Sequence, residues 1–522
     1  MSINFRGRLL AATLCAGAAG ASVPASAETL ADAVALAYQN NPTLQAQRAT
    51  QRALDESYVQ ARTGWRPTLT LGGAWQYAET ATPRTVAVAT GGNIDRNGDG
   101  IPDGAGRQDT ALSRGALTFT QPIWTGGRTA ASVNAANADV LAGRENLRRV
   151  EATVLVSVIQ AYSDVRRDLE ALRIRQENVN VLTRQLQESQ ARFDVGEVTR
   201  TDVAQSQARL AQAQALLQSA TAQIAISRAA YATLVGQNPG ELAPEPSLAY
   251  LLPTDPDQAY QIADQFNPQL RAQQYAEQAS RARVAGARAE RMPTVAAQAT
   301  LEFRNQVRDE VWERDFYTRG SSVGVSVSVP LFSGGLVSSR VRQAVERNNA
   351  DRITIEGVRR NVLQGVTQFW SQLIAARANI TSSEEQVRAA RIAAEGTRQE
   401  QQVGLRTTID VLNAEQELRQ AELNAVSSRR DEYVAAANVL ATMGRLEGRN
   451  LVPSVSQYDA GKNFRKLRIT WGWVPWEEPI SIVDHFATPF PAKAPALKPL
   501  EEPKGPGLEP PPAPPAQQPA TR

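Results

Sequence analysis

Apolar residues recur at every seventh position along several long stretches of the chain. A sustained period of seven predicts α-helices that supercoil around neighbouring helices. Gly and Pro are absent from long parts of these stretches, so the predicted helix from Gly127 to Phe193 spans on the order of 100 Å. The periodic positions are Val133, Val140, Leu147 and Val154; Val158, Val165, Leu172, Val179, Leu186 and Phe193; Val203, Leu210, Leu217, Ile224 and Tyr231; and Val366, Leu373, Ile380 and Val387.

Shorter segments between these stretches alternate apolar and polar residues with a period of two. The clearest runs from Val323 to Leu331, where Val alternates with Ser and Gly. The alternation predicts four strands, near residues 67–77, 115–124, 293–304 and 321–332. Together with aromatic residues at strand ends, this alternation favours a transmembrane barrel with a water-filled interior over a soluble β-sandwich. The aromatic residues are Trp75, Tyr77, Trp124 and Phe332.

Several short motifs occur twice, which predicts two tandem structural repeats. The motif Asn41-Pro42-Thr43-Leu44 returns 226 residues later as Asn267-Pro268-Gln269-Leu270. The motif from Pro122 to Gly127 returns 208 residues later, from Pro330 to Gly335. The smaller second offset indicates an insertion in the first copy, and the Gly/Asp-rich run from Gly91 to Asp109 is the candidate.

The first residues have the features of an export signal. Arg6 and Arg8 precede an apolar run, and Ala25-Ser26-Ala27 provides a small-residue cleavage site.

The C-terminal tail is expected to be disordered from about residue 489 because it is rich in proline. The predicted segments are a signal peptide (1–27), the first repeat (28–240), a linker (241–255), the second repeat (256–452) and a C-terminal tail (453–522), in which Trp471, Trp473 and Trp476 are candidates to dock on the helices.

Composition argues against several classes of function. The 56 Lys and Arg residues nearly balance 53 Asp and Glu, which leaves +3 and disfavours a nucleic-acid-binding protein. His485 is the only histidine, and the only cysteine, Cys15, lies in the predicted signal peptide. Metal clusters, disulfides and His-dependent catalytic triads are therefore disfavoured. We expect a protein that is not an enzyme and needs no cofactor.

Four strands cannot close a membrane barrel, and an open sheet edge in lipid leaves amide groups without partners. The chain is therefore predicted to oligomerise, giving 8, 12 or 16 strands for two, three or four copies. Each strand pair leads into long helices through a turn that suits an abrupt change of direction. The predicted barrel-to-helix turns contain Pro122, Gly126 and Gly127 in the first copy and Pro330, Gly334 and Gly335 in the second.

Together these landmarks resemble the TolC family of outer-membrane efflux proteins, from about Thr29 to Leu451. The most specific parts are the two-copy layout, the two Pro-x-x-x-Gly-Gly turns, and the segment Val403 to Ala414 with its counterpart Val195 to Val203. The resemblance implies an α+β membrane protein with two tandem structural repeats per chain. It implies a homotrimer in outer-membrane lipid, with a 12-stranded transmembrane β-barrel (four strands per chain) continued by a long 12-helix periplasmic α-barrel.

The resemblance also implies a function and a set of partners. The family provides passive exit ducts for efflux or type I protein secretion. Such a duct is opened at its periplasmic tip by a periplasmic adaptor (membrane fusion protein) working with an inner-membrane pump or ABC transporter. The alternative left open by the residues is a secreted or surface coiled-coil structural protein, which explains the heptads but not the Val/Ser strands.

Roles at the periplasmic tip are carried over from the resemblance. Arg406 matches the family's gate arginine, which bonds across the entrance to positions matching Thr201 and Asp202. Asp410 matches the aspartate of a three-fold constriction ring. This chain departs from the pattern in two places, because Asn413 stands where a second ring aspartate is found and Gln401 replaces the gate tyrosine.

The Gly/Asp-rich insertion contains a calcium-loop pattern. Asp95, Asn97, Asp99 and Asp103 have the alternating spacing of calcium ligands. The run lacks the downstream glutamate of an EF-hand, so a plain Gly/Asp loop is the favoured interpretation and no metal site is predicted.

Overall fold

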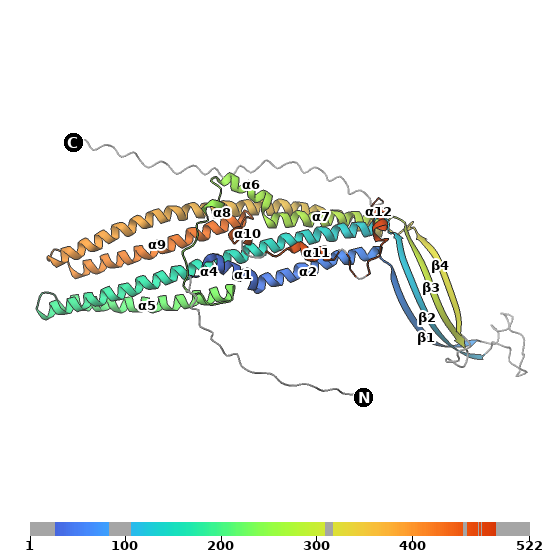
Figure 1. The fold of residues 1–522 in the computed structure, drawn as a ribbon, viewed down its shortest axis with the longest axis horizontal. Helices are drawn as coiled ribbons and strands as arrows, with labels where there is room; N and C mark the ends of the chain where they lie inside the picture. Colours follow the sequence, from blue (N-terminus) through green and yellow to red (C-terminus); the bar gives the residue numbers. More distant parts are fainter. Residues whose placement is uncertain are drawn as a thin grey trace, which may run out of the picture. The chain divides into compact units, whose positions relative to one another are not determined.

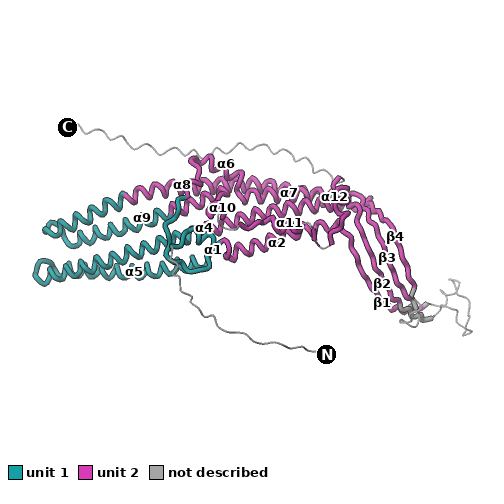
Figure 2. The backbone as a smooth tube through the Cα atoms, in the orientation of Figure 1, with its two compact units in different colours: residues 1–37, 158–247, 385–430 teal, residues 38–157, 248–384, 431–522 magenta. Residues whose placement is uncertain are grey.

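The chain divides into two compact units, called unit 1 and unit 2 in Figure 2. Unit 1 contains residues 1–37, 158–247 and 385–430, and unit 2 contains the rest, so each unit combines segments of both repeats. The computed structural model describes residues 27–82, 106–307, 317–452, 457–467, 469–470 and 472–486.

Unit 2 contains one antiparallel sheet with the strand order β1–β2–β3–β4 (Figure 1). The four strands and the two tandem repeats predicted from the sequence are confirmed. β1 and β2 extend further than the alternation indicated, because their pairing continues until Thr82 lies opposite Gly106. The strands are β1 (Thr68–Thr82), β2 (Gly106–Trp124), β3 (Thr294–Val307) and β4 (Tyr317–Ser328).

Each repeat contains a long helix followed by a return helix. The long helices α4 (Arg128–Asp194) and α8 (Leu336–Gln402) both have 67 residues. The return helices are α5 (Arg200–Val235) and α9 (Thr408–Thr442). In unit 1 these four helices pack through small apolar side chains, as the heptads predict. Two buried clusters consist of Ala390, Ala394, Leu418 and Ala421, and of Leu182, Ala213 and Leu412.

A pair of shorter helices precedes the strands in each repeat. Asn41 lies between α1 (Leu30–Asn40) and α2 (Pro42–Arg62), and Asn267 lies between α6 (Pro256–Phe266) and α7 (Pro268–Ala289). Both asparagines have nearly the same backbone angles, and each side chain accepts two N–H groups of the following helix. The repeated Asn-Pro motif is thus a helix cap, with proline at a position where no N–H is needed.

The C-terminal segment of unit 2 forms ordered structure that the sequence did not indicate. It contains the short helices α10 (Gly448–Leu451) and α11 (Ala460–Lys466), followed by α12 (Glu477–Phe486). Tyr458 and Ala460 pack on a buried cluster of Tyr38, Leu44 and Leu147. The proline-rich tail expected from residue 489 lies outside the described residues.

The described helices include none that is both long and apolar enough to cross a bilayer.

Candidate functional site

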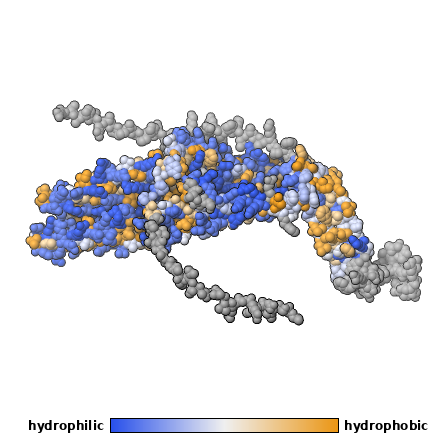
Figure 3. Space-filling model, in the orientation of Figure 1, coloured by the Kyte–Doolittle hydropathy of each residue, from blue (hydrophilic) through white to orange (hydrophobic). Residues whose placement is uncertain are grey.

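One face of the sheet is apolar across all four strands. The register places Leu69 opposite Phe119, Phe119 opposite Ala299, and Ala299 opposite Val323. Leu71, Trp75, Val325 and Val327 lie on the same face and are exposed. Figure 3 shows hydrophobic side chains gathered over the strands. An exposed apolar face of this extent suits contact with lipid.

The opposite face of the sheet is polar. Thr70 lies opposite Thr118, Thr118 opposite Thr300, and Thr300 opposite Ser322. On this face Arg114 forms an ion pair with Glu302, with 2.8 Å between Nε and Oε1. The two faces together give the alternation that a water-filled barrel requires.

The turn between β2 and α4 depends on glycine. Gly126 and Gly127 have φ angles of 67° and 83°, which glycine adopts without strain. At Gly126 a Cβ would lie 2.4 Å from Cβ of Met292, so a larger residue does not fit there. Gly334 and Gly335 repeat these angles at the second turn, with φ of 60° and 83°.

The first turn is closed by a carboxylate from α12. Asp484, which is fully buried, accepts backbone N–H groups from Thr125, Gly127 and Ala130 at 2.9, 3.0 and 3.2 Å. It also accepts the Thr125 hydroxyl at 2.8 Å and the Trp65 indole N–H at 3.1 Å. The start of α4 is a favourable place for a negative charge, because its first N–H groups have no partner within the helix.

These hydrogen bonds decide the ionisation of Asp484. Burial acts to raise its pKa, but the bonds from Gly127, Trp65 and Thr125 outweigh burial and hold the pKa below the ordinary value of 3.8. The carboxyl group is therefore ionised at neutral pH.

A second buried carboxylate fixes the other end of α12. Glu477 accepts from Nε of Arg62 at 2.6 Å and from Nε of Arg66 at 3.0 Å. Trp476 donates its indole N–H to Oε1 of Gln121 at 2.9 Å. Of the tail tryptophans proposed to dock, Trp476 thus contacts the end of β2. Sequence reasoning missed both carboxylates, although two acids seven residues apart on one helix face were a readable signal.

The helical hairpins of the two repeats end in matching turns in unit 1. Gly196 and Gly404 have φ angles of 83° and 80°. The N–H after each glycine donates across the turn, from Glu197 to the Arg192 carbonyl and from Leu405 to the Glu400 carbonyl, both at 2.9 Å. This bond pattern ends a helix and satisfies carbonyls that would otherwise lack a donor.

Asp202 of the predicted gate and Asp410 of the predicted ring lie shortly after these turns, and each takes part in the cap of a return helix. The Thr199 hydroxyl donates to Asp202 at 2.7 Å, and the Thr407 hydroxyl donates to Asp410 at 2.6 Å. The Thr407 hydroxyl, and after it the Thr407 backbone N–H, hold the pKa of Asp410 below its ordinary value. The spacing Thr-x-x-Asp is a capping-box signal that sequence reasoning passed over.

Arg406 is paired within its own turn. Its Nε lies 2.8 Å from Oε2 of Glu400, and the bond to Glu400 raises the pKa of the guanidinium. Thr201 and Asp202, its predicted partners, lie on the other hairpin, at the start of α5. Their bonding to Arg406 across an assembly stays a prediction.

The two departures from the family pattern have different surroundings. Asn413 accepts from Nη2 of Arg209 at 2.9 Å, and the same arginine donates to Gln416 at 2.6 Å. Arg209 therefore joins α5 to α9 at the position where the family pattern has a second ring aspartate, and sequence reasoning did not single it out. Gln401 is buried and donates to Thr408 at 3.4 Å, so it closes its own turn.

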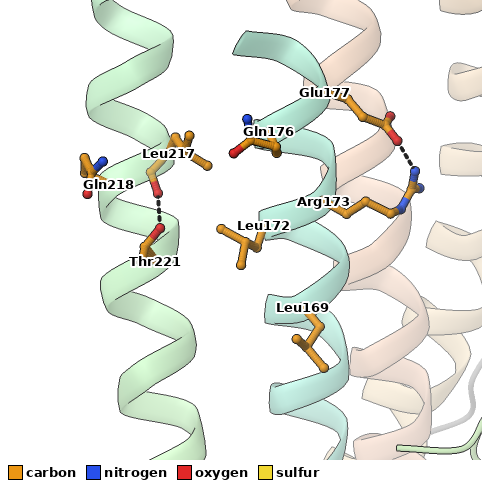
Figure 4. A pocket seen from close by; sticks show the side chains of 8 residues that line it. All are labelled: Leu169, Leu172, Arg173, Gln176, Glu177, Leu217, Gln218 and Thr221. Atoms are coloured by element: carbon orange, nitrogen blue, oxygen red, sulfur yellow. Dashed lines mark hydrogen bonds and ion pairs between the residues drawn. The ribbon is translucent and has the colours of Figure 1, made fainter. Parts of the chain in front are cut away.

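A shallow groove lies between α4 and α5 in unit 1 (Figure 4). Leu169, Leu172 and Leu217 provide its apolar part, while Arg173 and Glu177 form an ion pair at its edge. The described residues contain no group of three acids or histidines that could hold a metal. The calcium candidates Asp95, Asn97, Asp99 and Asp103 lie outside the described residues.

Comparison with known proteins agrees with the fold. Over 88% of its length the chain is 32% identical to the outer membrane efflux protein BepC of Brucella suis, 95% of which is covered. It is 28% identical, over 57% of its length, to the alkaline protease secretion protein AprF of Pseudomonas aeruginosa, 63% of which is covered. The outer membrane channel CmeC of Campylobacter jejuni has a similar fold, with a TM-score of 0.67 and 15% identity over 84% of this chain and 89% of that one.

The match to a protein family covers both repeats. Residues 33–237 and 259–445 match the outer membrane efflux protein family, and these ranges contain α2 and α7, the long helices and their return helices, the four strands and both hairpin turns. The chain therefore belongs to the outer membrane efflux protein family and is located in the outer membrane, with its helical part in the periplasm.

Proposed function

We propose that three copies of the chain form one channel through the outer membrane. Three four-stranded sheets give a 12-stranded barrel, continued by a 12-helix tunnel in the periplasm. The observation that supports this most directly is the sheet itself. Its apolar face is aligned across all four strands, but within the described part of the chain β1 and β4 each pair with a single strand. Closure by neighbouring copies pairs these edges, which lipid requires.

The channel acts as a passive exit duct for efflux or type I secretion. The similarity to BepC, named as an efflux protein, and to AprF, named as a protease secretion protein, supports both uses. The polar face of the sheet lines the lumen in this arrangement, and no chemical step is needed for passage. A periplasmic adaptor and an inner-membrane pump or ABC transporter supply the energy and the substrate.

The adaptor engages the tips of the helical hairpins. Val195, Val403 and Leu405 lie in the two turns and are strongly exposed, although they are apolar. Exposed apolar residues at the same place in both repeats favour docking of another protein. This leaves the sides of the helices to contacts between copies.

The gate is formed by residues next to these tips. In the closed state Arg406 exchanges Glu400 for Thr201 and Asp202 of the neighbouring hairpin. Once the gate is open, three copies of Asp410 form the narrowest ring, with Asn413 beside it. Because Asn413 is neutral and bonded to Arg209, the constriction contains a single ring of charged residues, that of Asp410.

The mass of the detergent-solubilised protein tests the assembly. We expect three mature chains per particle, and step-like conductance when the particles are added to planar bilayers. A stable monomer that still conducts contradicts the closure argument. Recovery of the protein outside the membrane fraction favours the coiled-coil structural protein instead.

A further inference from the structure

The helix α12 has an unusual distribution of side chains. Its buried face contains two acids, Glu477 and Asp484, together with Ile480, which packs on Trp65 and its neighbours. Its exposed surface includes large apolar side chains, since Ile482 is 56% exposed and Phe486 is 88% exposed, together with Glu478 and His485. Surface helices of water-soluble proteins have the opposite arrangement, with acids outside and apolar residues inside.

Exposed apolar side chains also occur in the residues before α12. Several exposed apolar side chains lie between residues 469 and 486 of unit 2. Polar contacts such as those of Glu477 and Asp484 attach this stretch to the rest of the unit. We call these exposed apolar side chains the C-terminal ridge. Its members are Ile469, Trp473, Trp476, Ile482, Val483 and Phe486.

The C-terminal ridge lies at the end of the sheet's apolar face. Gln121, which bonds to Trp476, follows Leu117 and Phe119 in the alternation and pairs with Ala297, so it belongs to the apolar face of β2. Ile123, the next apolar residue along β2, is also exposed. The lipid-facing surface of the strands therefore continues onto the ridge where β2 leads into α4, which is the periplasmic end of the sheet.

We propose that the C-terminal ridge binds the periplasmic leaflet of the outer membrane, at the boundary between phospholipid headgroups and acyl chains. Tryptophan favours this boundary because its large ring is apolar while its N–H is polar, and helices with one apolar face lie in the plane of the boundary. Lipid is favoured over a second copy of the chain because the ridge is continuous with the lipid-facing side of the sheet. The proposal depends on the outer-membrane location and on neither the gate nor the conductance.

A contact with lipid explains why α12 buries its two acids and exposes its apolar side chains. Asp484 and Glu477 attach the helix to the turn and to α2, so the apolar side chains can face outward. The membrane surface then holds α12, and α12 holds the start of α4. The chain thus has a periplasmic anchor in addition to its strands.

Site-directed spin labelling of the full chain in phospholipid nanodiscs tests the proposal. Cysteine is introduced singly at Ile482→Cys or Phe486→Cys, with Ala215→Cys on the exposed surface of α5 as the control; the only native cysteine, Cys15, is replaced by serine. We expect labels at 482 and 486 to collide more with oxygen, which concentrates in lipid, than with a water-soluble nickel complex. The label at 215 is expected to show the reverse.

Two outcomes overturn the proposal. If labels at 482 and 486 are as accessible to nickel as the label at 215, water covers the ridge. If they are accessible to neither reagent, a protein surface such as a second copy of the chain covers it. Conductance of the same labelled samples is measured separately, so a channel that fails to conduct while its labels lie in lipid refutes the proposed function alone.

Discussion

Removal of the Asp484 carboxylate is expected to loosen the turn between β2 and α4. In Asp484→Ala three backbone N–H groups and the Trp65 indole lose a buried acceptor. A buried donor without a partner costs about 1–3 kcal/mol, so four of them would cost about 4–12 kcal/mol in a dry site. Water entering the vacated space replaces part of this, and we expect a local loss of about 3 kcal/mol, similar to that for breaking other buried pairs.

Hydrogen–deuterium exchange measures this loss locally, without requiring the whole assembly to unfold. The amides of Gly127 and Ala130, which donate to Asp484, report the opening of the turn. Because 1.4 kcal/mol is a factor of ten in an equilibrium constant, a loss of about 3 kcal/mol speeds their exchange about a hundredfold. Asp484→Asn, which keeps one acceptor oxygen but turns an NH2 group toward the donors, is expected to give an intermediate rate.

The control is Asp459→Ala, which removes an exposed carboxylate that caps α11 through the Gly461 N–H. Exchange at Gly127 and Ala130 is expected to stay unchanged in this variant. The reasoning is refuted if Asp484→Ala also leaves both amides protected to the wild-type degree.

The effect of pH on this contact has a definite sign. The pKa of Asp484 is lower in the folded chain than the ordinary value of 3.8, so the unfolded chain binds the proton more readily. The stabilisation is therefore complete above the ordinary value and is lost as the pH falls through the lowered one. Neutral and mildly acidic conditions do not weaken the turn through this group.

Two further predictions concern the gate and the tail. Arg406→Ala is expected to raise single-channel conductance in planar bilayers. Asp410→Asn, which still accepts from Thr407, is expected to abolish block by a trivalent cation, and full block of this variant would place the ring elsewhere. The control is Asp459→Asn, which changes an exposed capping carboxylate outside the proposed gate and ring. Deletion of Phe490 to Arg522 is expected to leave assembly and export intact because the deletion stops short of α12, and loss of both would show that the tail is structural.

The sequence predicted the elements whose own side-chain pattern determines them. The heptads gave the long helices because Val158, Val165 and Val366 pack into the interior at regular intervals. The Val/Ser alternation gave β4, although that strand ends at Ser328, before Pro330, which has no N–H for a ladder. In these places the local pattern and the packing require the same residues.

The parts that were not predicted depend on partners far away in the chain. The part of β2 from Gly106 to Arg114 has little apolar alternation. It is held by pairing with β1 and, from Ala111 onward, also with β3. The helix α12 is held by contacts more than 350 residues distant in sequence, such as that between Gly127 and Asp484. Apolar residues normally mark the buried face of a surface helix. This rule predicts the wrong orientation for α12, because the buried face of this helix contains two acids.

The two repeats have the same local geometry but differ at the turn that follows their strands. The first turn is closed by Asp484 from the same chain. At the second turn, among the described residues, no heavy atom beyond the glycine and its chain neighbours lies within 4 Å of the position that a Cβ would take at Gly334 or Gly335, and Leu331 is 93% exposed. This difference between the repeats suits the proposed oligomer, in which a neighbouring copy covers the open turn. In the proposed three-copy barrel the open turn is next to β4, the edge that must meet a neighbouring copy, so the asymmetry identifies the side of each chain on which the next copy belongs.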